Sequence, residues 1–475
     1  MATQNNKKIV HRKEWQMMNK APANSAAGSF IIKDPLGVMR STLYVVSSTV
    51  QYLYGADEDA WMQVASMALG GTFGAGACGA WGRWSNTLTA NGGTVATVTT
   101  ATGISNVAVG LTIRMLTGSQ AGKSATITDV DVVPGGTNTI TFTPAFSGAV
   151  VNTDTFMVAT GRYYVMGAGT VGAGIFKSID PLTGVITSLG TTGLPASWGT
   201  DGKLVSCPSY VGVYSTGTAS AGGATTLTDV TKNWGANTLC NQQVRITSGT
   251  GIGQVRSITT NTTTELTVPA WTTPPDATSV YNVEPNDDYL YLLGNNAVTM
   301  YRYSISAGTW TTLAPTVARA AAPGLSMSAN WFGKTGNATW ALETALRDGR
   351  YIYSFRGGAS GVLDRYDISG GTAGAGAWAT ITYTGATETF TTGSCCAQDS
   401  SKLYLKKEST GRFFFYDVIG NFLYPFTVDD YPEGTAVIGN KLFLASYSGG
   451  TGTDTIKWLY SLGNTSNILR RIMVF

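Results

Sequence analysis

The sequence predicts an all-β chain built from repeated small sheets. One pattern of three strands occurs six times along the 475 residues, and repetition of a supersecondary unit indicates a repeat architecture. The segments alternate apolar and polar residues with the two-residue period of strands, and none has the period of a helix. Charged residues make up only 12%, whereas 59 glycines and many Thr and Ser residues fill the predicted turns. This composition is typical of short strands and tight connections.

The clearest copy of the pattern is residues 287–315. It begins with the apolar run YLYLL, continues after a Gly-Asn turn as the alternating strand VTMYRYSI, and closes on TWTTL. The other copies are residues 41–65, 161–190, 349–383, 401–427 and 440–475. Gly- and Ala-rich segments such as residues 67–85 precede the copies, and their small side chains suit strands that crowd around a central axis. We expect residues 29–34 (SFIIKD) to supply the remaining inner strand and to clasp the ring, because closure removes open sheet edges.

Two stretches interrupt consecutive repeats at the same point. Residues 88–160 and 217–286 look like copies of each other, for example in IRMLTGSQAGKSATIT beside VRITSGTGIGQVRSIT. Duplication of a whole repeat would place an insertion at the same point of two neighbours. Each stretch is long enough to close a small β-sandwich or barrel of its own.

The repeats resemble those of kelch-type β-propellers. A kelch blade has a strand ending in a glycine pair and then a Tyr-Asp-x-x-(Thr/Ser)-Gly-x-Trp hairpin, and no copy here has every element. The pieces present are Gly357-Gly358 with Tyr366-Asp367, Asp180-Pro181-Leu182-Thr183-Gly184, Ala307-Gly308-Thr309-Trp310 and Gly449-Gly450. Residues 304–310 also look like a sialidase Asp-box in which Ser306 replaces the Asp. Both resemblances imply a propeller.

The resemblance implies a six-bladed kelch-like β-propeller with two homologous inserted β-domains and an extended N-terminal arm. Outside the arm and the insertions the six units average about 50 residues, which is the kelch period. The expected parts are the arm (1–28), the propeller (29–87, 161–216 and 287–475), and the inserted β-domains (88–160 and 217–286).

Composition argues against several classes of protein. The net charge of +3 is too small to indicate nucleic-acid binding. No run of 18 apolar residues predicts membrane insertion, and the first residues lack the apolar core of a secretory signal, so we expect synthesis in a cytoplasm without export. The five cysteines, Cys78, Cys207, Cys240, Cys395 and Cys396, include no CxxC pair and are expected to be small buried hydrophobes.

Candidate catalytic groups are sparse. The single histidine, His11, excludes Ser-His-Asp and Cys-His catalysis and any His-rich metal centre. Thr117-Gly118-Ser119-Gln120-Ala121-Gly122-Lys123-Ser124 ends like a phosphate-binding loop, but Thr117 replaces the first glycine and a β-branched strand follows instead of a helix. The helix N-terminus that would hold phosphate is therefore missing.

Carboxylates and arginines leave glycoside chemistry as an alternative. The acidic groups are Asp57-Glu58-Asp59, Asp287-Asp288, and Asp429-Asp430 with Glu433, but the sequence does not fix their separations, which glycoside cleavage requires to be about 5 to 9 Å. A sialidase would also need clustered arginines, for which Arg302, Arg350, Arg356 and Arg365 are the candidates. The simpler interpretation is solvated turns and strand faces. We therefore expect no enzyme activity, no catalytic residue, no metal site and no cofactor.

The combination of features is similar to virion proteins of tailed bacteriophages. These resemble this chain in being unexported, poor in charge, rich in Gly, Thr and Ser, and decorated with duplicated β-modules. The resemblance implies a structural protein of the tail, neck, baseplate or capsid decoration, assembled in the host cytoplasm. Its expected partners are other virion proteins and further copies of itself, with a host-surface glycan as a further candidate. The alternatives are a glycan-binding or glycan-hydrolysing propeller and an intracellular kelch-like adaptor.

The N-terminal arm is the expected anchor in such an assembly. It carries the partner-binding candidates Lys7, Lys8, Arg12, Lys13 and Trp15. Trp15 and the neighbouring Met17-Met18 are costly to leave in water. The arm is therefore either a flexible terminus or a segment that docks on a neighbouring subunit.

Overall fold

The computed structural model describes most of residues 87–317 and 350–427, with internal gaps. Outside these ranges it describes Leu69, Arg319 and the strands at 16–17, 30–33, 41–46, 50–55, 60–63, 78–84, 326–331, 432–438, 441–446 and 459–461. This part of the chain contains strands and no α-helix. The predicted all-β class is therefore confirmed.

Six antiparallel sheets of similar plan follow one another along the described residues. Sheet 1 is β2(Phe30–Lys33)-β3(Ser41–Val46)-β4(Val50–Gly55)-β5(Ala60–Gln63), and sheet 2 is β6(Cys78–Trp84)-β13(Thr160–Met166)-β15(Phe176–Ile179)-β16(Ile186–Ser188). Sheet 3 is β18(Lys203–Ser206)-β27(Tyr289–Leu293)-β28(Met300–Ser304)-β29(Thr309–Leu313), and sheet 4 is β30(Ser326–Trp331)-β31(Tyr351–Arg356)-β32(Leu363–Asp367)-β33(Ala377–Ile381). Sheet 5 is β35(Cys395–Asp399)-β36(Lys402–Lys406)-β37(Arg412–Asp417)-β38(Phe422–Thr427), with the short parallel strand β34(Thr384–Gly385) beside β38. Sheet 6 is β39(Pro432–Ile438)-β40(Lys441–Ser446)-β41(Leu459–Ser461)-β1(Gln16–Met17).

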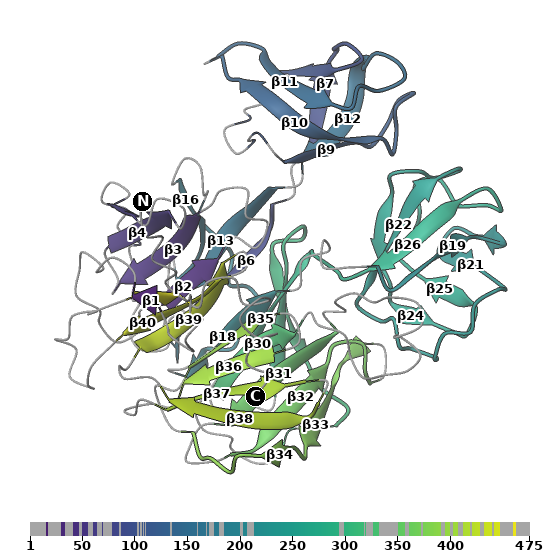
Figure 1. Ribbon diagram of the computed structural model, residues 1–475. Coiled ribbons are helices and arrows are strands. Elements are labelled where there is room, and N and C mark those ends of the chain that lie inside the picture. Colours follow the sequence, from purple (N-terminus) through teal and green to yellow (C-terminus); the bar gives the residue numbers. More distant parts are fainter. Residues whose placement is uncertain are drawn as a thin grey trace, which may run out of the picture.

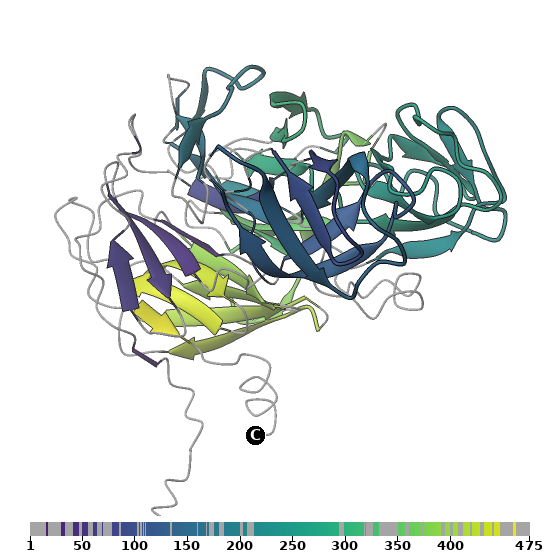
Figure 2. The ribbon, with the colours of Figure 1, turned by 90° about the horizontal axis from the view of Figure 1, so that it is seen from above.

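The first strands of these sheets form a closed cycle of contacts. In order around the cycle, the contacting strands are β2, β6, β18, β30, β35 and β39, and β39 contacts β2 again. Figure 2 shows the purple strands of sheet 1 beside the yellow strands of sheet 6, so the first and last sheets lie side by side. Sheets that radiate from a common axis in this way fit a β-propeller.

The two ends of the chain meet in a way that the sequence predicts only in part. The predicted inner strand at residues 29–34 is present as β2, which pairs with β3. The strand that joins the ends, however, is β1 from the N-terminal arm, in which Gln16 pairs with Ser461 and Met17 with Tyr460. The outer edge of sheet 6 is thus covered by the beginning of the chain.

Aromatic side chains fill the space between neighbouring sheets. Between sheets 2 and 3, the ring of Phe176 lies 4.8 Å from that of Tyr303 and 5.0 Å from that of Trp310, centroid to centroid. The central strands β15, β27 and β31 are buried along almost their whole length. Both faces of these strands are covered because each sheet around a ring packs against one neighbouring sheet on either side.

Backbone hydrogen bonds also join successive sheets at their outer strands. Trp310 N of β29 donates to Thr192 O, in the segment that leaves sheet 2, at 3.0 Å. Trp378 N of β33 likewise donates to Val317 O, in the segment that leaves sheet 3, at 3.0 Å. Strand β34, which leaves sheet 4, pairs with β38 of sheet 5. In these three places, the segment that leaves one sheet is therefore joined by backbone hydrogen bonds to the outer strand of the next sheet.

Apart from the two-stranded sheet β14(Gly169–Thr170)-β17(Ser197–Gly199), two further groups of described strands lie outside the six sheets, at the top and right of Figure 1. Module 1 lies between β6 and β13 of sheet 2, and module 2 between β18 and β27 of sheet 3. Module 1 is one sheet, β7(Thr87–Asn91)-β12(Asn152–Val158)-β9(Thr112–Met115)-β10(Ser124–Asp131)-β11(Asn138–Thr143)-β8(Thr97–Thr100). Module 2 has two, β19(Ser215–Thr218)-β26(Val280–Glu284)-β22(Gln243–Ser248)-β23(Val255–Ser257) and β24(Thr260–Asn261)-β25(Glu265–Thr267)-β21(Thr226–Thr228)-β20(Ala221–Gly222).

Equivalent strands follow one another in the same order in the two modules. Strands β7, β12 and β9 of module 1 correspond to β19, β26 and β22 of module 2, and β11 and β8 correspond to β25 and β21. Strand β10 of module 1 has a register irregularity between Ile127 and Asp129, and at the matching place module 2 has the separate strands β23 and β24. Each module also has its own apolar core, around Ile113 and Phe156 in module 1 and around Val244 and Tyr281 in module 2.

Candidate interaction site

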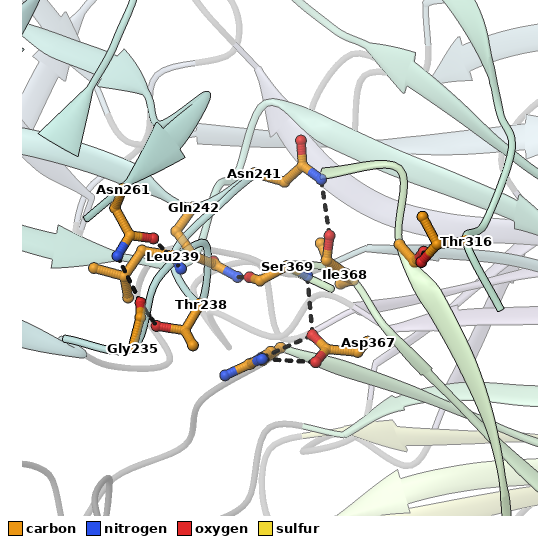
Figure 3. A network of polar contacts seen from close by, with 12 residues as sticks. Gly235, Thr238, Leu239, Asn241, Gln242, Asn261, Thr316, Asp367, Ile368 and Ser369 are labelled. Atoms are coloured by element: carbon orange, nitrogen blue, oxygen red, sulfur yellow. Dashed lines mark hydrogen bonds and ion pairs between the residues drawn. The ribbon is translucent and has the colours of Figure 1, made fainter. Parts of the chain in front are cut away.

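Module 2 is bound to sheet 4 by a buried polar contact (Figure 3). The segment at residues 234–242 of module 2 faces the turn at residues 367–376, which joins β32 to β33. Asn241 and Gln242 provide the contact from module 2, and Ile368, Ser369 and Gly374 receive it. The contact therefore joins residues that lie 127 to 133 positions apart in the sequence.

Asn241 is the centre of this contact. Its Nδ2 donates to Ile368 O at 2.8 Å and to Gly374 O at 2.7 Å, and its Oδ1 accepts a hydrogen bond from Arg302 of β28. The backbone of Asn241 has a φ of 64°, a left-handed conformation that Asn adopts more readily than most residues. This conformation lets one side chain satisfy three groups from sheets 3 and 4.

Gln242 extends the contact to the adjacent residue. Its Nε2 donates to Ser369 Oγ at 3.0 Å, and Ser369 is fully buried. Asn241 is 8% exposed and Gln242 2%, so the hydrogen bonds are closed off from water. Leaving such buried partners unsatisfied costs about 1 to 3 kcal/mol, and module 2 is therefore held firmly in one orientation.

The receiving turn in sheet 4 is itself held by an ion pair. Arg350 Nε and Nη2 donate to Asp367 Oδ1 and Oδ2 at 2.7 and 2.6 Å, and Ser369 N donates to Asp367 Oδ1 at 3.0 Å. Burial works to lower the pKa of Arg350, but the hydrogen bonds and charge of Asp367 outweigh it, so the pKa of Arg350 is raised. A bidentate pair of this kind is among the stronger polar contacts in proteins, and it fixes the turn that Asn241 and Gln242 bind.

The four arginines considered for a sialidase site bind partners within the molecule. Arg302 contacts Asn241 and lies over the ring of Tyr289, Arg350 binds Asp367, Arg356 binds Asp364, and Arg365 lies over the ring of Tyr351. A site for one carboxylate would need several of these guanidinium groups to converge. Each of the four instead has partners within the molecule, although Arg350 and Arg365 share the ring of Tyr351.

The carboxylate of Asp288, another candidate, caps a turn. It accepts hydrogen bonds from Ser306 N, Ser306 Oγ and Ser304 Oγ at 2.9, 2.8 and 2.7 Å. Ser306 occupies the position of the missing Asp-box aspartate, and the aspartate that holds this turn comes from the start of β27 instead. Asp287 is also described, and its charge acts on Arg114. The remaining acidic candidates, Asp57, Glu58, Asp59, Asp429 and Asp430, lie outside the described residues, as does the side chain of Glu433 in β39.

The segment that ends like a phosphate-binding loop is the turn of the β9–β10 hairpin. The strand predicted after it is confirmed as β10. Cys78 and Cys240 are buried, as expected of small hydrophobes. In the described part of the chain, no three His, Cys, Asp or Glu residues lie together as potential metal ligands. The same part contains no helix with the length and apolar character needed to cross a membrane.

The predicted partner-binding residues Lys7, Lys8, Arg12, Lys13 and Trp15 lie outside the described residues. The nearest described residues, Gln16 and Met17, form β1. Sequence reasoning did not identify Asn241 and Gln242. The sequence contains an Asn-rich turn at this point, but it offers no signal that links it to residues 127 positions further on.

Comparisons with known proteins give distant structural similarities only. No protein-family model and no curated protein matches the chain. The calcium-binding protein regucalcin from Agrobacterium tumefaciens is similar with a TM-score of 0.38 and 10% identity, over 95% of this chain and 94% of that one. A chain of the mitotic checkpoint complex is similar with a TM-score of 0.33 and 8% identity, over 94% of each chain. Similarities this low assign neither a fold nor a function to the chain.

Proposed function

We propose that this chain is a structural protein of a bacteriophage virion, in the tail, neck, baseplate or capsid decoration. The six sheets are the blades of a kelch-like propeller, and modules 1 and 2 are homologous domains inserted into two consecutive blades. The ring is a rigid platform, and the modules present surfaces to neighbouring subunits. The partners are other virion proteins and further copies of the chain.

The observation that carries this proposal is the buried contact of Asn241 and Gln242 with sheet 4. A module joined to a ring by two strands alone could turn about its connections, whereas this contact holds module 2 in one orientation. Fixed orientation is what a many-copy assembly needs, because symmetry repeats each contact and turns a weak interaction into a firm one. The engagement of Arg302, Arg350, Arg356 and Arg365 with partners inside the molecule favours the same role over glycan cleavage.

The assignment to a phage particle rests on the composition and the duplicated modules in the sequence. It predicts that the chain co-purifies with phage particles in a fixed number of copies per particle, measured by quantitative mass spectrometry of particles banded by density. Free chain that stays in the lysate while particles assemble without it would reject the proposal.

A variant pair tests the role of the fixed module. Asn241→Ala removes the contact with Ile368 and Gly374, and we expect incorporation into particles to fall several-fold while the ring stays folded. Asn237→Ala is the matched control, because Asn237 also has a left-handed backbone, with a φ of 57°. Among the described contacts, the side chain of Asn237 makes no hydrogen bond to the ring. Equal incorporation of both variants would contradict the role of fixed orientation.

A further inference from the structure

The hairpin β9–β10 of module 1 and the hairpin β22–β23 of module 2 are equivalent in detail. In module 1, Met115 N donates to Lys123 O and Gly122 N to Met115 O, at 2.9 and 2.8 Å. In module 2, Ile246 N donates to Gln254 O and Gly253 N to Ile246 O, at 3.0 and 2.9 Å. Gly122 and Gly253 share a positive φ, of 76° and 86°. Thus Gly122 corresponds to Gly253, and Leu116 to Thr247.

These equivalent hairpins contact each other reciprocally. A Cβ placed on Gly253 would lie 3.0 Å from Leu116 O, and one placed on Gly122 would lie 3.4 Å from Thr247 O. Gly253 of module 2 therefore lies against the backbone oxygen of Leu116 in module 1. Gly122, the equivalent glycine of module 1, lies against the backbone oxygen of Thr247, the residue of module 2 that is equivalent to Leu116. Ile252 of module 2 also packs its Cδ1 against Gly122. This reciprocity is the signature of an isologous contact, in which two like surfaces meet about a two-fold axis.

The charged residues at the contact follow the same correspondence. Arg114 and Arg245 occupy equivalent positions, two residues before Leu116 and Thr247 respectively. Burial, followed by the charge of Arg245, lowers the pKa of Arg114, whereas Glu284 and Asp287 act in the opposite direction. Arg245 Nε lies 2.6 Å from Glu284 Oε1 in a buried ion pair. The acidic groups of module 2 thus offset the repulsion between the two facing arginines.

A groove between the modules confirms that they lie side by side. Its volume is about 470 Å³, and it is lined by Leu116, Thr117 and Met157 of module 1 and by Ile252, Gln254 and Arg256 of module 2, among others. Apolar side chains from both modules therefore approach one another across the contact.

We propose that the β9–β10 face of module 1 is a self-complementary interaction surface whose partner is another module of the same type, here module 2. The two modules consequently act as one paired unit. Module 2 is bound to sheet 4 through Asn241, and module 1 takes its position from module 2. This inference goes beyond the proposed function, because the pairing holds whatever assembly the chain joins.

The distance between the modules in the full chain tests the pairing. Spin labels are placed at Val151→Cys and Val230→Cys, positions that are 54% and 68% exposed, after replacement of any native cysteine that reacts with the label. Pulsed electron paramagnetic resonance should give one narrow distance distribution. Ile252→Asp, which puts a charge at the contact, should abolish the narrow peak, and so should Leu116→Asp from the opposite side.

Val133→Asp is the matched control, because it introduces the same charge at an exposed valine of module 1; it should leave the distribution unchanged. Thermal unfolding of each variant shows whether the ring has stayed folded. A broad distribution in the unsubstituted chain would overturn the pairing. A narrow peak that survives both Ile252→Asp and Leu116→Asp would overturn it equally, whichever particle the chain belongs to.

Discussion

At the scale of single residues, the carboxylate of Asp364 on β32 binds two arginines at once. Arg319 Nε and Arg356 Nε lie 2.5 and 2.7 Å from Asp364 Oδ2, and Thr380 Oγ1 donates to Asp364 Oδ1 at 3.0 Å. Burial raises the pKa of this carboxyl, but the hydrogen bonds and charges of Arg356 and Arg319 outweigh burial, so the pKa of Asp364 is lowered. The carboxylate therefore stays ionised inside the protein, where it compensates two arginines.

Asp364→Asn should lower the free energy of unfolding by about 3 to 5 kcal/mol, because it leaves buried arginine charge uncompensated. The lowered pKa means that this stabilisation is fully present above the unfolded pKa of about 3.9 and is lost as the pH falls through the folded pKa. Urea unfolding between pH 7 and pH 3 should show a constant difference between the two proteins that shrinks only below about pH 4. Asp129→Asn, at an exposed position of β10, is the control and should change little; an equal loss in both variants would refute the role of Asp364.

At the scale of elements, aromatic packing joins one sheet to the next. Phe176 of sheet 2 is fully buried against Tyr303 and Trp310 of sheet 3. These two residues belong to the strands VTMYRYSI and TWTTL, which the sequence predicted and the structure contains as β28 and β29. The period of two residues thus locates a strand, but it does not show which neighbouring sheet a buried ring will meet.

Phe176→Ala should lower the free energy of unfolding by about 3 to 5 kcal/mol, as expected for loss of a buried aromatic ring and the cavity that remains. Val185→Ala removes an apolar side chain that is 56% exposed immediately before β16 of the same sheet, and it should cost less than about 0.5 kcal/mol. Chemical denaturation of the two variants measures both values. Losses of similar size would mean that the interface between sheets 2 and 3 does not depend on Phe176.

Contacts between distant segments explain what the sequence left open at this scale. Asn241 meets Ile368 only after the ring has brought module 2 and sheet 4 together, so no local pattern marks the pair. The arginines were recognisable as candidates, but the partners of Arg302, Arg356 and Arg365 depend on which face of the sheet each occupies. A one-residue change in register would reverse that face.

At the scale of the whole molecule, the beginning and end of the chain belong to one sheet. Strand β1 is only two residues long and pairs with β41 at the outer edge of sheet 6. So short a strand has no readable period, and for this reason residues 1–28 were predicted as an arm that is flexible or docks elsewhere. Closing the last sheet with the first strand covers an edge that could otherwise pair with another chain.

Deleting residues 1–17 should therefore lower the melting temperature by several degrees and promote aggregation, because the edge of β41 is uncovered. Deleting residues 1–11, which leaves β1 intact, is the control and should leave the melting temperature unchanged. Differential scanning calorimetry and light scattering measure the two effects. If both deletions melt like the full chain, β1 does not contribute to closing the ring.

The central claim is that a closed ring of sheets holds its modules in fixed positions for contact with neighbouring subunits. A cryo-electron-microscopy reconstruction of phage particles, in which we propose that the chain is a structural component, tests it most directly. The account predicts ring-shaped density from this chain in a symmetric position, with both modules in the arrangement of Figure 1 and at least one of them buried against a neighbour. Particles without this density, or a ring whose modules take many orientations and touch nothing, would contradict it.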